Sequence, residues 1–154
     1  GSYTGLRVGL AAAKGICYAL KIPLIGIHTL DWIAFGNQSE NIDLLCPMID
    51  ARRMEVFTGL YSKEMNRLLE PSALVLEEQS FSTQLAEQRI GFVGNGAAKW
   101  KDICLHPNAV FPDAAHNTTH FTRMSLTHYQ NKQFLDLAYA EPFYTKEFFN
   151  TQKK

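Results

Sequence analysis

The stretch that decides the fold is LLCPMIDARRMEVFTGLYS, residues 44–62. It contains two runs of strand-forming residues separated by a charged turn at residues 51–53, which predicts a β-hairpin. Side chains of the second run alternate between two faces, with Val56, Thr58 and Leu60 on one and Phe57 and Tyr61 on the other. Both faces carry apolar residues, so we expect the hairpin to lie inside a sheet.

The chain continues with a regular succession of short elements. RLLEPSALVL (67–76) predicts a third extended segment, interrupted at Pro71, and SFSTQLAEQ (80–88) predicts a capped helix. RIGFVGNGAAKWKDIC (89–104) reads as strand, glycine turn and helix, and NAVFPD (108–113) as a brief strand. A final helix is predicted over 118–140, before an irregular tail that ends basic; its expected core residues are Phe121, Met124, Leu126, Phe134 and Leu137.

The residues that precede the hairpin repeat the end of this order. A helix over 4–21, a short strand in PLIGIHTL (23–30) with a cap at Thr29, and a helical turn ending at Gly36 give helix, strand and helix. The polar segment NQSENID (37–43) separates them from the hairpin. We therefore expect two similar α/β lobes, with residues 1–43 closing the first and residues 44–154 forming a complete second.

The first helix is rich in small and apolar residues. Ser2 or Thr4 can cap its start, and Pro23 ends it. Two stripes follow the helical period: Leu6, Leu10, Ala13, Cys17 and Leu20 on one, and the small residues Gly5, Gly9, Ala12 and Ala13 beside it. We expect this helix to be buried on most sides, because its glycines cost helix stability that close packing can offset. Either the chain's own sheet or a partner helix could supply that packing.

Composition excludes several classes of protein. Apolar residues make up 46% and charged residues 19% of the 154, and fifteen basic residues balance fifteen acidic ones. With no net charge, contact with tRNA would need a local patch or a charged partner. Cys17, Cys46 and Cys104 are widely spaced, which argues against a disulfide framework or a structural zinc site. No apolar run approaches the roughly 20 residues that span a bilayer, so we expect a soluble cytoplasmic protein without membrane contact.

Five blocks carry a family resemblance. In chain order they resemble the bacterial TsaB (YeaZ) family: GSYTGLRVGLAAAKGICYAL (1–20), PLIGIHTLDWIA (23–34), MIDARRMEVFTGLY (48–61), GFVGNGAAKW (91–100) and EPFY (141–144). That resemblance implies the actin/Hsp70-like, ribonuclease H-like α/β fold, with the N-terminal part of the first lobe missing. It also implies a non-catalytic role in tRNA threonylcarbamoyladenosine synthesis, alongside the catalytic paralogue TsaD and the ATPase TsaE. ATP and metal are then expected on those partners, tRNA contact only through them, and a homodimer when no partner is present.

The resemblance favours the docking interpretation of the first helix, because the family's dimerisation face lies there. The residues expected to face a partner are Tyr3, Leu6, Gly9, Leu10, Ala13 and Cys17, with Arg7 and Lys14 flanking them in the same partner-binding surface. If their flank is bare to solvent, or sealed beneath the chain's own strands, this interpretation loses its physical basis.

Other motifs leave alternatives open. Gly94, Asn95 and Gly96 form either a structural turn, which we favour, or a nucleotide-proximal turn at a helix N-terminus. HNTTH (116–120) predicts a surface helix start capped by Thr118 or Thr119, with a two-histidine metal site as the alternative. Around residues 50–55 an Arg–carboxylate pair or a solvated charged turn is expected. We assign no catalytic or metal-binding residue; the alternative functions are an actin-like ATP-binding phosphotransferase and a glycoprotease-like (M22-type) metallopeptidase.

Overall fold

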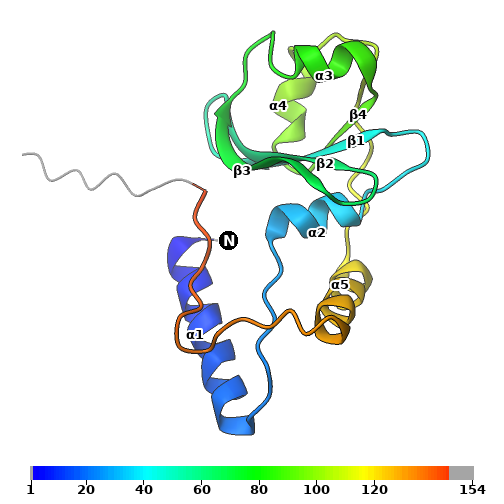
Figure 1. Ribbon diagram of the computed structural model, residues 1–154. Helices are drawn as coiled ribbons and strands as arrows, with labels where there is room; N and C mark the ends of the chain where they lie inside the picture. Colours follow the sequence, from blue (N-terminus) through cyan, green and yellow to red (C-terminus); the bar gives the residue numbers. More distant parts are fainter. Residues whose placement is uncertain (1, 146–154) are drawn as a thin grey trace, which may run out of the picture.

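The computed structural model describes residues 2–145, so Gly1 and the basic end of the chain lie outside the described residues. It contains a single mixed sheet and helices on both of its faces (Figure 1). In chain order the elements are α1 (Tyr3–Leu20), α2 (Thr29–Phe35), β1 (Leu44–Asp50), β2 (Glu55–Ser62), β3 (Arg67–Val75), α3 (Ser82–Glu87), β4 (Ile90–Val93), α4 (Ala97–Lys101), β5 (Ala109–Val110) and α5 (Thr118–Gln130).

The predicted hairpin at 44–62 is confirmed and forms the centre of the sheet. The strands lie in the order β3-β2-β1-β4-β5, with β1–β2 and β2–β3 antiparallel and β1–β4 and β4–β5 parallel. Central strands are apolar on both faces, which is the pattern expected where helices cover both sides. The predicted element order from residue 44 onward is therefore confirmed.

Two apolar clusters hold the layers together. On one face Met48, Val56, Phe92 and Trp100 pack between the sheet and the short helices α3 and α4, which lie above the sheet in Figure 1. On the other face α2 packs through Leu30 and Ala34 against Leu45 and Tyr61. The side chains of Tyr61 and Trp100 are almost completely buried. This division follows the predicted alternation, because Val56 and Tyr61 belong to opposite clusters.

Two local predictions are wrong. Residues 23–30 form no strand but a single bridge, between Leu24 and Leu135. The last helix ends at Gln130, and of its expected core residues Met124 alone is buried.

The predicted interruption at Pro71 takes the form of an irregularity in pairing. Strand β3 continues through Pro71, but its register with β2 shifts between Leu69 and Ser72. Proline is tolerated there because β3 is an edge strand.

Helix α1 lies apart from the sheet. In Figure 1 it stands below the sheet, and the segment that follows α5 passes along it. Cys17 is its one buried residue. The prediction that this helix is buried on most sides is wrong for the chain by itself, because the sheet contacts α2, α3 and α4 instead. Within residues 2–145 no helix is both long enough and apolar enough to cross a membrane.

Candidate partner-binding surface

Helix α1 begins and ends as local rules predict. The Ser2 hydroxyl accepts a hydrogen bond from the Gly5 N–H at 3.1 Å, which makes Ser2 the N-cap. Lys21 takes a left-handed conformation at the C-cap, and its N–H reaches the last carbonyls of the helix. Pro23 follows two residues later, so two features end the helix: the left-handed C-cap and the proline.

One flank of α1 contacts the C-terminal segment. Lys14 Nζ donates to the carbonyls of Ala138 and Ala140, both at 3.1 Å. The rings of Tyr3 and Tyr144 lie 4.8 Å apart, and Arg7 donates to the Tyr3 hydroxyl at 2.8 Å. The Cys17 thiol also lies 3.7 Å from the Pro23 carbonyl. Four of the residues predicted for the partner surface thus have intrachain contacts: Tyr3, Arg7, Lys14 and Cys17.

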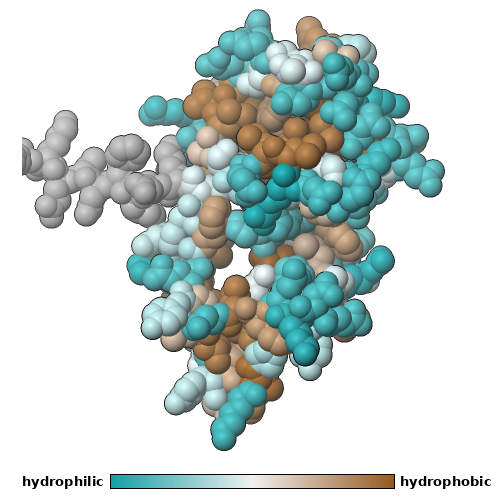
Figure 2. Space-filling view, in the orientation of Figure 1, coloured by the Kyte–Doolittle hydropathy of each residue, from teal (hydrophilic) through white to brown (hydrophobic). Residues whose placement is uncertain are grey.

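The other flank of α1 is bare. Gly5, Gly9, Ala12 and Ile16 recur at helical spacing and are exposed; we call these four residues the bare stripe. A Cβ added at Gly9 would meet no atom within 4 Å. Val8 lies beside the stripe and is 64% exposed, and Ile16 is 57% exposed. Apolar surface gathers over the lower part of α1 in Figure 2.

The remaining predicted residues divide between the two flanks. Leu6, Arg7 and Gly9 are exposed, whereas Leu10 and Ala13 are half-buried at the border of the contacted flank. Sequence reasoning missed Val8 and Ile16, although the spacing of Val8, Ala12 and Ile16 was a usable signal. Within residues 2–145 the small-residue flank is therefore bare to solvent. This is the outcome stated above to go against the docking interpretation, so docking at this flank rests on family membership and not on packing seen within the chain.

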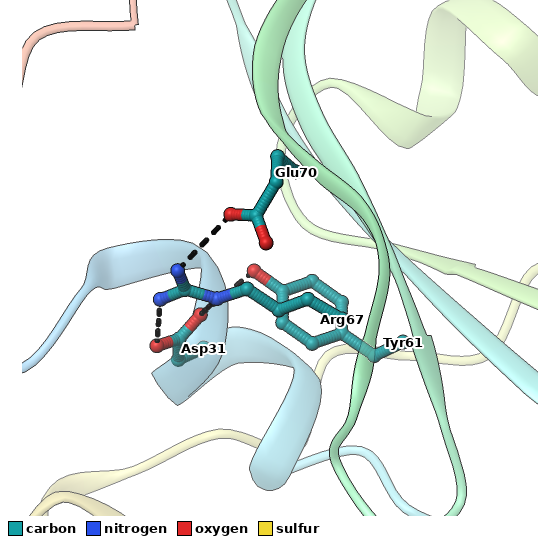
Figure 3. A network of polar contacts seen from close by, with 4 residues as sticks. All are labelled: Asp31, Tyr61, Arg67 and Glu70. Carbon is teal, nitrogen blue, oxygen red and sulfur yellow. Dashed lines mark hydrogen bonds and ion pairs between the residues drawn. The ribbon is translucent and has the colours of Figure 1, made fainter.

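A second polar site joins α2 to the sheet. Arg67 binds both carboxylate oxygens of Asp31, with Nε at 3.2 Å from Oδ1 and a terminal nitrogen at 2.6 Å from Oδ2, and the Tyr61 hydroxyl donates to Oδ1 at 2.8 Å (Figure 3). Glu70 accepts from the other terminal nitrogen of Arg67 at 3.2 Å. Nothing in the sequence pattern singled out this group, because its members come from α2, β2 and β3.

The polar group at α2 shifts the pKa values of its neighbours. Burial, and then the bond to Asp31, raise the pKa of Tyr61, and the Asp31 carboxylate raises the pKa of Arg67. Burial lowers the pKa of His28, whose ring lies 4.4 Å from that of Phe143. His28 is thus partly buried. Each of the four groups in Figure 3 has a partner, so the arrangement fixes α2 on the sheet.

The glycine turn after β4 has a structural explanation. Gly94 has a φ of 104°, and a Cβ there would clash with the Met48 carbonyl. The Asn95 amide oxygen accepts from the Asp50 N–H at 3.0 Å, and Lys99 pairs with the Asp50 carboxylate at 2.5 Å. Asp50 thus pairs with a lysine of α4 rather than with an arginine of its hairpin. Contact of Gly94, Asn95 and Gly96 with a nucleotide stays a prediction.

The two histidines of the HNTTH motif lie near α2. Asn117, rather than a threonine, caps α5, since its side chain accepts from the His120 N–H at 3.2 Å. His116 precedes the helix, so the two rings do not share a helical face; its ring lies 4.8 Å from that of Trp32. Both Nδ1 atoms are buried without a hydrogen-bond partner among the described residues. Those residues include no group of three or more potential metal ligands.

Sheet order and two-sided helical cover define the class. A β3-β2-β1-β4-β5 sheet, in which β1, β2 and β3 are antiparallel to one another in turn and β4 and β5 are parallel to β1, is an α/β fold of the actin and ribonuclease H-like kind. Two solved structures from Pseudomonas aeruginosa share it at 19% identity: a protein with similarity to peptidase YeaZ (TM-score 0.72, 95% of this chain and 69% of that one) and YeaZ (TM-score 0.65, 94% and 70%).

Sequence comparison then places the chain in a family. Residues 1–141 match the model of the family TsaD, tRNA N6-adenosine threonylcarbamoyltransferase. The chain belongs to this family, and its curated relatives place it with the TsaB/YeaZ proteins. It is 43% identical to Bacillus subtilis TsaB over 70 residues, or 46% of this chain and 30% of the relative. It is 30% identical to Escherichia coli TsaB over 119 residues, or 73% and 51%. The chain thus spans about half or less of these relatives.

Proposed function

We propose that the chain is a non-catalytic partner subunit in tRNA threonylcarbamoyladenosine biosynthesis. The curated relatives are named for this pathway, and the family model that matches is that of a tRNA threonylcarbamoyltransferase. The observation that carries the proposal is the match of residues 1–141 to this family model. The bare stripe on α1 is the surface that we propose for the partner. Because the chain spans only 69–70% of the YeaZ structures, the part of such a protein that this chain does not include is the alternative cover for this flank.

The bare stripe has the shape that a helix–helix contact needs. Small residues let a second backbone approach closely, and Val8 and Ile16 provide apolar area at about 25 cal/mol per Å² buried. We propose Leu6 and Gly9 as partner-facing, with Val8 and Ile16 added, and Arg7 as a flanking residue, because it bonds Tyr3 on the contacted flank. Leu10 and Ala13 lie at the border. Of the remaining predicted residues, Tyr3 and Lys14 contact the C-terminal segment and Cys17 contacts the Pro23 carbonyl.

The proposed partner at this surface is the catalytic paralogue TsaD, with the ATPase TsaE joining the complex and a homodimer forming when TsaD is absent. ATP and metal then belong to those subunits. Residues 1–43 would close a first actin-like lobe and residues 44–154 would form the second. In that division the Asp31–Arg67 contact joins the two segments, because Asp31 lies on α2 and Arg67 on β3.

Substitution of Gly9 tests the surface without disturbing the chain. Because nothing lies within 4 Å of an added Cβ, Gly9→Leu leaves the fold intact and raises helix propensity by about 1 kcal/mol. We expect the wild-type chain to co-elute with TsaD in size-exclusion chromatography and Gly9→Leu to abolish the complex. Gly15→Leu is the matched control, since Gly15 is equally open and lies about 120° around the helix.

The outcomes separate the surface from the pathway. Co-elution that Gly9→Leu does not change would remove the bare stripe as the docking surface. No complex between the wild-type chain and TsaD, together with unchanged threonylcarbamoyladenosine in tRNA from cells depleted of the protein, would contradict the proposed function itself.

A further inference from the structure

Six residues other than glycine have a positive φ within the described chain: Lys21, Arg52, Arg53, Met65, Phe81 and Lys132. A side chain in this left-handed region costs about 1–2 kcal/mol per residue relative to the right-handed one. The cost persists only where surrounding structure or function offsets it.

Four of these residues have a visible structural reason. Lys21 closes α1 and Lys132 follows the last turn of α5, where a left-handed residue satisfies the terminal carbonyls of a helix. Met65 packs against the cluster beneath α2, and Phe81 packs against the cluster beneath α3 and α4. Burial of these two side chains compensates the backbone conformation.

Arg52 and Arg53 have no such reason. They are consecutive, with φ of 71° and 46°, and both are exposed in the turn between β1 and β2. Neither caps a helix or packs in a core. Among residues 2–145 neither guanidinium makes a hydrogen bond or an ion pair. Asparagine and glycine occupy such positions at much lower cost, so local stability alone does not account for two arginines.

The base of this turn is held rigidly. The Asp50 carboxylate accepts the Arg52 N–H at 2.7 Å and pairs with Lys99, which also donates to the Glu55 carbonyl at 3.0 Å. Lys99 and the Arg52 N–H together hold the pKa of Asp50 below its usual range. The two guanidiniums are thus attached to a rigid turn, and the carboxylate of Asp50 at its base is already paired with Lys99. Such preorganisation lowers the entropy lost when a ligand binds.

We propose that the Arg52–Arg53 turn binds phosphates of an RNA backbone. A guanidinium matches phosphate geometry through paired N–H donors, and phosphate contacts need no apolar surroundings. A protein interface centres on large apolar or aromatic anchors, and the exposed apolar side chains near this turn in the described chain are Met54, 37% exposed, and Val75, 56% exposed. The proposal rests on the proposed role in tRNA modification. From the zero net charge and the family resemblance we expected contact with tRNA only through partners, and the two arginines would add a direct contact.

The test is a binding titration of fluorescently labelled, unmodified tRNA at about 20 mM and about 100 mM salt, with the chain alone and with TsaD added. The variant is Arg52→Asn/Arg53→Gly, which fits the same φ values and should melt at the wild-type temperature or above it. Loss of two phosphate contacts should weaken binding on the order of 20-fold near 0.1 M salt. It should also reduce the slope of log K against log salt by about 1.4–1.8.

Two controls isolate the arginine charge. Arg52→Lys/Arg53→Lys keeps both charges on the same backbone and should retain most of the salt slope. Lys132, at the end of α5, is also a cationic residue with a positive φ. Lys132→Gly removes that charge outside the turn and should leave RNA binding unchanged.

Each result decides between explanations. Unchanged affinity and slope in Arg52→Asn/Arg53→Gly, or no tRNA binding by the wild type at low salt with or without TsaD, overturns the proposal. Loss of the TsaD complex with RNA binding intact would point to an acidic protein partner and would also overturn it. Loss of RNA binding with the TsaD complex intact supports it. RNA binding that depends on the two arginines while no TsaD complex forms would contradict the proposed docking but not the RNA contact.

Discussion

Replacing Asp31 with asparagine should destabilise the chain by about 2 kcal/mol. The carboxylate receives two bonds from Arg67 and one from Tyr61, and the side chains of Asp31 and Arg67 are 21% and 33% exposed. A hydrogen bond to a charged group contributes roughly 1.5–3 kcal/mol, whereas an exposed ion pair contributes at most about 1 kcal/mol. This half-buried pair falls between those limits. Asparagine also turns an N–H donor toward a guanidinium that has no acceptor.

Thermal and urea unfolding followed by circular dichroism measure this loss. For a chain of this size about 2 kcal/mol corresponds to a melting temperature roughly 4–8 °C lower. A double-mutant cycle with Tyr61→Phe should show coupling of about 0.5 kcal/mol or more, because both side chains act on the same oxygen. Glu70→Gln is the control: its side chain is 76% exposed, so the change should stay within about 0.5 kcal/mol. A loss below about 0.5 kcal/mol for Asp31→Asn, or strictly additive effects, would refute the reasoning.

Three further results are expected. Because burial lowers the pKa of His28 from 6.5, the stability that its neutral form provides is present above pH 6.5 and decreases as the pH falls through the folded-state pKa. Between about pH 7 and pH 5 the melting temperature of the wild type should therefore fall by more than that of His28→Gln. Burial raises the pKa of the Cys46 thiol to about 12, so mass spectrometry should find Cys46 unalkylated at pH 8 until the chain is unfolded, and rapid native labelling would contradict this. Gly94→Ala should cost about 2 kcal/mol or more in urea unfolding, since its Cβ would strike the Met48 carbonyl at a positive φ; an unchanged midpoint would show that the turn relaxes.

The parts of the fold that sequence predicted are those set by local chemistry. Ser2 and Pro23 delimit α1 through capping and φ restriction, and the alternation of Val56 and Tyr61 assigns the faces of β2 correctly. Residues 23–30 failed because strand formation needs a neighbouring strand, and the described chain offers only Leu135 there.

The candidate site was harder to predict than the fold. The position of α1's surface followed from its small residues, but which flank is bare depends on where the C-terminal segment passes, and that segment lies more than 100 residues away in sequence. The Asp31–Tyr61–Arg67 contact joins three elements and has no local signature. Backbone strain at Arg52 and Arg53 is equally invisible in sequence, because neither position carries the glycine or asparagine that marks a positive φ.

The clasp between Lys14 and the carbonyls of Ala138 and Ala140, with the Tyr3–Tyr144 stack beside it, has a mechanical consequence. If the chain is pulled at Ser2 and at the end of the described C-terminal segment, the force acts first on these contacts between α1 and that segment. The sheet bears force only after they break. Single-molecule extension should then show a small early rupture that frees α1, followed by a larger one at higher force when the strands separate.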